Sequence, residues 1–177
     1  MKLKTLLPIL LVVSGGCVEL IEFNGVPIRQ YTNKVIAFSS QFSATTWSAA
    51  QSLGKENVYP KYGDSNKAWA SLKADDKREF LVLGLDTPQT AKTIEIYETY
   101  NPGAIDSIFV RRLDSGEWIK VYSKPVADDL PKEARVFSIF LNEATYLVDA
   151  VRIAINSPAI AGWNEIDAVA ITGEREQ

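Results

Sequence analysis

Aromatic and amide side chains gather in three stretches of this sequence, and together they are the groups that bind carbohydrates. A sugar packs the C–H faces of its ring on aromatic side chains, while its hydroxyls hydrogen-bond to nearby amides and carboxylates. The aromatic members are Trp47, Tyr59, Tyr62, Tyr100 and Trp163, and the polar members are Asn101, Asn156, Asn164 and Asp64. The alternative is that these rings close the open end of a small sandwich. Trp69 and Trp118 lie in or next to predicted strands, where we expect core positions.

Other chemistry is excluded by composition. The chain has no histidine, which removes Ser-His-Asp and Cys-His nucleophiles and the usual zinc sites. A bound metal would need oxygen ligands, which points to calcium. Asp75 and Asp76 are adjacent and therefore point in different directions, so they do not suit the facing carboxylates of a glycosidase. With no nucleophile elbow or phosphate loop, we expect the protein not to be an enzyme.

The single cysteine, Cys17, lies where a lipid anchor would be attached. Lys2 and Lys4 precede the apolar run 6–13, and three small residues follow at 14–16. These are the parts of an export signal. The run is far shorter than the ~20 residues that a helix needs to cross a bilayer.

The order Gly15-Gly16-Cys17 resembles the end of a bacterial lipoprotein signal, in which the cysteine is acylated and becomes the first mature residue. The motif usually has Leu three residues before the cysteine, where this chain has Ser14. The resemblance implies a signal peptide over 1–16 and a palmitate-bearing Cys17. An ordinary secretory signal and a free buried thiol are the alternatives. Val18 is not the Asp that commonly retains lipoproteins in an inner membrane, so an outer membrane is favoured.

Cleavage before Cys17 would leave 161 of the 177 residues, which is one domain of ordinary size. Because Lys2 and Lys4 would be removed, 17 basic and 22 acidic residues remain, a net charge of −5. No basic patch stands out, which argues against nucleic-acid binding. One cysteine cannot form an internal disulfide, so burial of a core must stabilise the domain.

The rest of the chain reads as short strands broken by turns, which predicts an antiparallel β-sandwich or barrel. Ile94 and Ile96 share one face, and Val151, Ile153 and Ile155 alternate with polar or small residues. Residues 17–34 are interpreted as a tether, and the long stretch 43–67 as a loop with one helical turn near 48–53. The predicted strands are 35–42, 68–72, 79–85, 92–98, 105–112, 117–122, 135–141, 150–156 and 165–172.

Three segments together carry a family resemblance: 39–43 with Tyr62-Gly63-Asp64 and Trp69, the run Glu98-Thr99-Tyr100-Asn101-Pro102-Gly103-Ala104, and 156–169. They resemble the galactose-binding-like jelly rolls, which include discoidin and coagulation-factor type C domains. The nearest subgroup occurs in bacterial surface proteins and at the front of an F-box protein with leucine-rich repeats. The resemblance covers residues 35–173 and implies a jelly-roll β-sandwich that binds glycans, lipid headgroups or proteins through loops at one end.

The resemblance also implies a structural calcium, because many of these jelly rolls hold one between the first long loop and an acidic residue at the last strand. Glu165 occupies the matching place, Asp64 is the partner from the long loop, and Asp167 lies close by. The alternative is that Asp64 caps a turn and Glu165 pairs with an arginine. Glu98 is expected to anchor its loop by accepting backbone N–H bonds.

Two functions stay open. The first is a membrane-tethered binding module of the bacterial envelope that recognises a glycan or surface ligand, through Trp47, Tyr62, Tyr100, Asn101, Asn156, Trp163 and Asn164. The second is a structural or assembly lipoprotein that docks a partner protein in the envelope. In both, the domain faces the periplasm or the exterior.

We predict that Cys17→Ser releases the protein from the membrane fraction or leaves it unprocessed, because the variant lacks the acylated cysteine that would anchor the wild type. Fractionation of cells that express the wild type and the variant checks this prediction. Mass spectrometry of the native protein that finds an unmodified thiol would contradict it.

Overall fold

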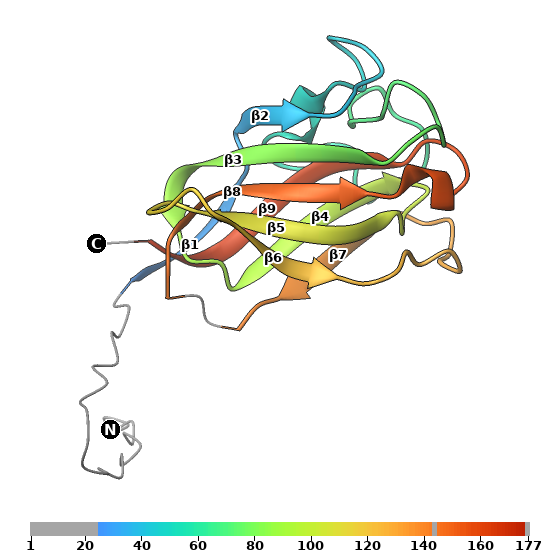
Figure 1. Ribbon diagram of the computed structural model, residues 1–177. Helices are drawn as coiled ribbons and strands as arrows, with labels where there is room; N and C mark the ends of the chain where they lie inside the picture. The colour runs from blue at the N-terminus through green and yellow to red at the C-terminus, as the bar shows by residue number, and fades with distance from the viewer. Residues whose placement is uncertain (1–24, 143–144, 176–177) are drawn as a thin grey trace, which may run out of the picture.

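The structure, a computed structural model, describes residues 25–142 and 145–175, which form a sandwich of two antiparallel sheets (Figure 1). One sheet has the strand order β1-β9-β4-β7 and the other β2-β3-β8-β5-β6. The predicted all-β antiparallel sandwich is confirmed. The strands are β1 Val26–Tyr31, β2 Lys34–Phe38, β3 Glu79–Gln89, β4 Thr93–Tyr100, β5 Ile105–Arg112, β6 Trp118–Ser123, β7 Arg135–Phe140, β8 Val148–Ile155 and β9 Glu165–Arg175.

Among the described residues, helix is confined to two short 3-10 turns, η1 Ala49–Ser52 and η2 Ser157–Ala159. The first lies within the helical turn that the sequence predicts near 48–53. None of the described residues belongs to a helix with the length and apolar character needed to span a bilayer. The predicted signal peptide and Cys17 lie outside the described residues.

The core follows the predicted alternation of the strands. Ile94 and Ile96 of β4 are fully buried between the sheets, as are Val151 and Ile153 of β8. Between those two residues Arg152 turns outward, where its guanidinium lies 4.7 Å from the centre of the Phe80 ring. Since each alternate side chain faces the same way in a strand, two strands with this pattern fix the inner faces of both sheets.

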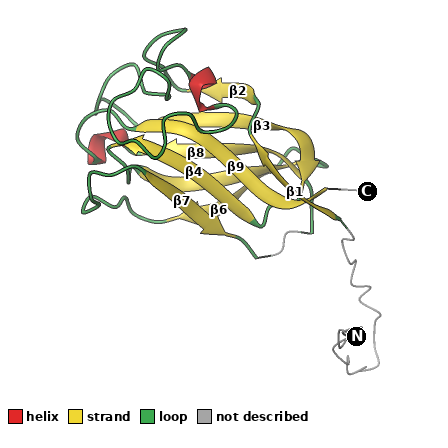
Figure 2. Cartoon of the chain, turned by 180° about the vertical axis from the view of Figure 1, so that it is seen from behind, coloured by secondary structure: helices red, strands yellow, loops and turns green. Residues whose placement is uncertain are grey.

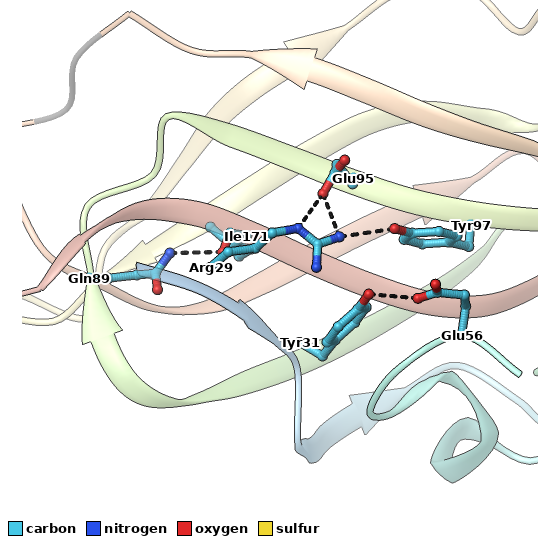
Figure 3. Close-up of polar contacts among 7 residues, drawn as sticks. All are labelled: Arg29, Tyr31, Glu56, Gln89, Glu95, Tyr97 and Ile171. Carbon is cyan, nitrogen blue, oxygen red and sulfur yellow. Dashed lines mark hydrogen bonds and ion pairs between the residues drawn. The ribbon is translucent and has the colours of Figure 1, made fainter. Parts of the chain in front are cut away.

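The interpretation of residues 17–34 as a tether is wrong for its last part. Residues 26–31 form β1, which pairs along its whole length with β9. Its side chains form hydrogen bonds across the outer face of the sheet (Figure 3). Arg29 donates to Glu95 and to the Tyr97 hydroxyl, each at 2.9 Å, and the Tyr31 hydroxyl donates to Glu56 at 2.6 Å. These contacts reach 25 to 68 residues along the chain, so the polar pattern of β1 did not reveal them.

One further strand assignment and one core assignment change. Residues 68–72 contribute only an isolated bridge between Trp69 and Ile166. Trp69 is nevertheless a core residue, 1% exposed, and its indole N–H donates to the Ser40 carbonyl at 3.0 Å. Trp118 is not a core residue: it is half-buried on the edge strand β6, with the Arg111 guanidinium 5.7 Å from its ring centre.

Four connections gather at one end of the sandwich, which we call the loop end: residues 39–78, 101–104, 124–134 and 156–164. Figure 2 shows these loops clustered away from the start of β1 and the C-terminus. The antiparallel pairing explains the clustering, because β4 and β8 finish at the end where β5 and β9 begin. The predicted placement of Tyr100 and Trp163 at one end is therefore correct.

The long loop 39–78 is fixed to the first residues of β9. The Asp167 carboxylate is completely buried and accepts the backbone N–H groups of Asn57, Val58 and Tyr59 at 2.9–3.2 Å. Asp167 has no partner in the pairing of β4 with β9, since Tyr97 pairs with Ala168 and Glu98 with Ile166. This bulge frees its side chain to meet the loop.

We predict that Asp167→Asn lowers the free energy of unfolding by about 2–3 kcal/mol, because a buried amide replaces one acceptor oxygen with a donor that faces backbone N–H groups. Urea denaturation of the wild type and the variant measures the change. Asp149→Asn is the matched control. Asp149 forms a half-exposed ion pair with Arg111, so its loss should cost at most ~1 kcal/mol. Equal effects of the two variants would contradict the anchoring role of Asp167.

Candidate functional site

Asn101 is the junction of three loops at the loop end. Its side-chain amide donates to the Trp163 carbonyl at 2.9 Å and accepts from the Tyr62 hydroxyl at 3.2 Å. Its own carbonyl accepts from the Asn164 amide at 2.8 Å. The structure thus brings together residues that lie up to 102 positions apart in the sequence. Gly162 is required here, because its φ is +92° and a Cβ would lie 2.8 Å from the Asn101 amide nitrogen.

The turn that carries Asn101 is itself anchored by Glu98. This buried carboxylate accepts the Gly103 N–H at 2.9 Å and the Arg135 guanidinium N–H at 2.6 Å. The expectation that Glu98 holds its loop through backbone N–H bonds is confirmed. Burial raises the pKa of Glu98, while the charge of Arg135 and the Gly103 N–H act in the opposite direction.

An aromatic cavity of about 130 Å³ opens beside this junction. It is lined by Phe42, Trp47, Asp64, Ala70, Trp163 and Glu165. The Phe42 ring is central: its centroid lies 5.2 Å from the Trp47 ring and 6.0 Å from the Trp163 ring, both in edge-to-face contact. Phe42 is 44% and Trp163 37% exposed, so both rings are partly open to solvent at the loop end.

Both indoles of the aromatic cavity are held in fixed orientations. The Trp47 indole N–H donates to Asp64 at 2.8 Å, and that of Trp163 donates to the Ser71 carbonyl at 3.1 Å. Trp47 has a φ of +49°, a left-handed conformation that costs a large side chain of order 1–3 kcal/mol and is often found at functional sites. The structure therefore maintains an unfavourable backbone that presents this ring.

Two carboxyl groups form the polar part of the cavity. Glu165 is 1% exposed and accepts the Ser65 N–H at 3.0 Å. The pKa of Glu165 is raised to about 8, chiefly by burial and also by the adjacent Asp64 carboxylate, while the Ser65 N–H and the Trp47 indole act in the opposite direction. At neutral pH Glu165 therefore holds a proton beside an exposed Asp64.

The other predicted site residues do not line this cavity. Tyr62 and Tyr100 pack together with ring centroids 5.5 Å apart, next to Asn101. Asn156 is at the loop end, where its backbone carbonyl accepts the Ala159 N–H and opens η2. Tyr59 is outside the site, because its ring packs against Tyr97 on the outer face of the sheet at 5.4 Å.

Phe42 is the site residue that the sequence analysis missed. It was assigned to the end of a strand over 35–42, whereas β2 ends at Phe38 and residue 42 lies in the long loop. The feature of the sequence that could have identified Phe42 is its place directly before Ser43, where the aromatic stretch begins. A second hollow at the loop end, of about 220 Å³, has Asn101 in its wall together with apolar residues such as Leu130 and Ile160 and the charged residues Asp128 and Lys132.

The side chains at this place supply only two carboxyl groups for a calcium ion, so backbone carbonyls would have to complete its shell. Asp64 and Glu165 do lie together, as predicted, but the remaining walls of the cavity are aromatic carbons and Ala70. Asp167 is engaged by three backbone N–H groups. Across the described ranges no three side chains of Asp, Glu, Cys or His form a group able to hold a metal, whereas calcium takes six to eight oxygens.

We predict that Glu165 makes the stability of the domain fall as the pH rises. Between its ordinary pKa of 4.5 and about 8, the folded chain holds a proton that the unfolded chain has lost. The free energy of unfolding should therefore decrease by up to ~1.4 kcal/mol per pH unit within that window and level off above it. Glu165→Gln removes this slope.

Urea denaturation of the wild type and Glu165→Gln at intervals from pH 5 to pH 9 tests the prediction. Subtracting the two curves cancels the other titrating groups, including Glu98. A difference that does not change with pH would show that Glu165 titrates alike in the folded and unfolded chains.

Comparison with solved structures places the fold. The XRCC1 N-terminal domain, in its complex with the DNA polymerase β catalytic domain, superimposes with a TM-score of 0.59 and 17% identity, over 81% of this chain and 97% of that one. Chitosan-binding module 1 of a Paenibacillus sp. IK-5 chitosanase/glucanase superimposes with a TM-score of 0.52 and 16% identity, over 84% of this chain and 94% of that one. Allantoicase of Saccharomyces cerevisiae superimposes with a TM-score of 0.54 and 12% identity, over 78% of this chain and 39% of that one. These similarities establish a shared galactose-binding-like jelly roll.

Sequence comparison identifies the family. F-box/LRR-repeat protein 4 of Bos taurus is 23% identical over 184 residues, which cover 85% of this chain and 29% of that protein. The chain thus spans less than a third of the length of this curated relative. Residues 23–177 match the family described as pappalysin-1, SD scarf domain, C-terminal. This match includes all nine strands and every loop of the site, so the chain belongs to the SD scarf family.

Proposed function

We propose that this chain is a non-enzymatic binding module that recognises a carbohydrate at its loop end. The observation that carries the proposal is the aromatic cavity, where the partly exposed rings of Phe42 and Trp163 flank fixed hydrogen-bonding groups. Ligand pockets commonly combine apolar walls with a few well-placed polar groups in this way. The shared fold with chitosan-binding modules of Paenibacillus supports a carbohydrate as the ligand.

The arrangement of the acidic groups supports binding over hydrolysis. Glycosidases need two carboxyl groups roughly 5–10 Å apart across the scissile bond. Asp64 and Glu165 instead interact directly, and Glu165 is held by Ser65 beneath the aromatic rings. A pair in this position can contact a ligand but does not span a glycosidic bond.

The proposal includes a lipid anchor at Cys17 in the envelope of a bacterium, with an outer membrane favoured. The direction of β1 is consistent with such an anchor, because β1 begins at the end of the sandwich opposite the loops, where Val26 pairs with Arg175. A chain anchored ahead of Val26 would therefore turn the aromatic cavity away from the membrane and towards soluble or surface ligands.

A second candidate is a structural lipoprotein that docks a protein in the envelope. The edge strand β7 favours it, because Phe140 is 83% exposed there and borders a hollow of about 430 Å³ between β6 and β7. An exposed edge with a large apolar side chain is a surface that proteins use for strand pairing.

We predict that Trp163→Ala weakens carbohydrate binding by ~1–3 kcal/mol, the amount expected for loss of one aromatic contact. The thermal midpoint should change little because Trp163 is partly exposed. A glycan array identifies the best-bound oligosaccharide, and calorimetry measures its affinity for both proteins. Trp118→Ala, at the opposite end of the sandwich, is the control and should bind normally.

Two results would count against this function. If Trp163→Ala unfolds the domain, Trp163 is a structural plug of the loop end. If the array shows no specific sugar while Phe140→Ser abolishes capture of an envelope protein, the docking function takes precedence.

A further inference from the structure

The aromatic cavity has a charge arrangement that a neutral sugar does not require. Elsewhere Glu98 is paired with Arg135 and Asp149 with Arg111, while the buried Asp167 is satisfied by three backbone N–H groups. Within residues 25–142 and 145–175, neither Asp64 nor Glu165 forms an ion pair with a Lys or Arg. Two acidic groups thus share one cavity without a cation from the protein.

The walls of the cavity add to this preference for positive charge. The faces of Trp and Phe rings attract cations, and the attraction grows when water is displaced. On the surface of the sheets the chain places its own cations over rings, as with Arg152 over Phe80 at 4.7 Å and Arg112 over Tyr146 at 4.9 Å. Among the described residues, none of the cation–ring contacts involves Phe42, Trp47 or Trp163.

We propose that this cavity binds a positively charged amino group of the ligand, an organic ammonium such as the free amine of an amino sugar, between the aromatic rings and the carboxyls of Asp64 and Glu165. The inference rests on the proposed function, since it names the ligand class for the same loop end. The aromatic rings would contact the C–H groups and the cationic surface of the ligand. Asp64, which is exposed, would make the direct charge contact.

Size and chemistry favour an organic ammonium over a metal ion. About 130 Å³ corresponds to roughly four water molecules at ~30 Å³ each, which suits an ammonium group with its attached carbons. A metal ion would have to exchange its water shell for aromatic carbon, whereas an alkylammonium has apolar C–H groups that these walls can contact.

Binding of a cation should also displace the proton that Glu165 holds at neutral pH. The groups that face Glu165 are Asp64, the Ser65 N–H and the Trp47 indole from the long loop, and Tyr100 is its ladder partner in β4. An ammonium favours the ionised form of the carboxyl pair. Affinity for a cation of constant charge should therefore rise as the pH increases from 6 towards 8.

Choline, whose charge does not depend on pH, is the first probe for the full-length chain. Its neutral carbon analogue 3,3-dimethylbutan-1-ol has the same shape without the charge. We expect choline to shift the NMR signals of the Trp47 and Trp163 indole N–H groups and to bind more tightly at pH 8 than at pH 6. The neutral analogue should bind at least about tenfold more weakly.

Asp64→Asn tests the charge contact, because it keeps the shape and the acceptor for the Trp47 indole. We expect choline affinity to fall by roughly tenfold or more. Asp76→Asn makes the same change in net charge at an exposed residue that does not line the cavity, and should bind as the wild type does. Equal binding of choline and its neutral analogue, or equal behaviour of the two variants, would overturn the inference.

Sugar probes separate this inference from the proposed function. Glucosamine oligomers that bind more tightly than their N-acetylated counterparts, with the difference lost in Asp64→Asn, support both. If the two oligomers bind equally well and Trp163→Ala weakens both, the carbohydrate-binding function is supported and the ammonium site is refuted. Choline binding without any binding of sugars on the array keeps the ammonium site and refutes the carbohydrate module.

Discussion

The start of β9 is the constraint on which the loop end depends. The loop 39–78 is 40 residues long and contains one short 3-10 turn, so most of its backbone N–H groups lack partners within regular structure. Three successive residues of β9 supply fixed attachment points: Glu165 accepts Ser65, Ile166 bridges Trp69, and Asp167 accepts Asn57 to Tyr59. Buried backbone groups that stay unpaired are costly, so these contacts confine the loop to one path.

The two acidic residues of this strand are engaged differently. Asp167 accepts three backbone N–H groups and does not line the aromatic cavity. Glu165, two residues earlier, shares its environment with Asp64 and lies at the aromatic cavity. Both carboxyl groups hold the loop through its backbone N–H groups, and Glu165 in addition lines the aromatic cavity. A rigid strand that carries both roles links the stability of the site to its electrostatics.

The jelly roll by itself does not decide what such a site binds. The same sandwich occurs in a DNA-repair protein bound to a polymerase domain, in a chitosan-binding module and in allantoicase. The loop end of this chain carries an aromatic triplet, a left-handed Trp47 and, within the described residues, an acid pair that forms no ion pair with Lys or Arg. The proposals for this chain therefore depend on those side chains.

The sequence by itself determined the fold class, because alternation in strands such as 92–98 and 150–156 depends only on which side chains must leave water. It also located the loops of the site, since aromatic residues outside strands and turn residues are local signals. Tertiary structure alone decided that β1 joins the sheet through Arg29 and Tyr31, that Tyr59 faces the sheet and not the ligand, and that Phe42 completes the aromatic cavity. Each of these depends on partners dozens of residues away, and pairing at that distance leaves no periodic trace in the chain. The pairing of Asp64 with Glu165 was foreseen, but their environment was not: aromatic walls, rather than oxygen ligands, surround them because the loop folds back over β9.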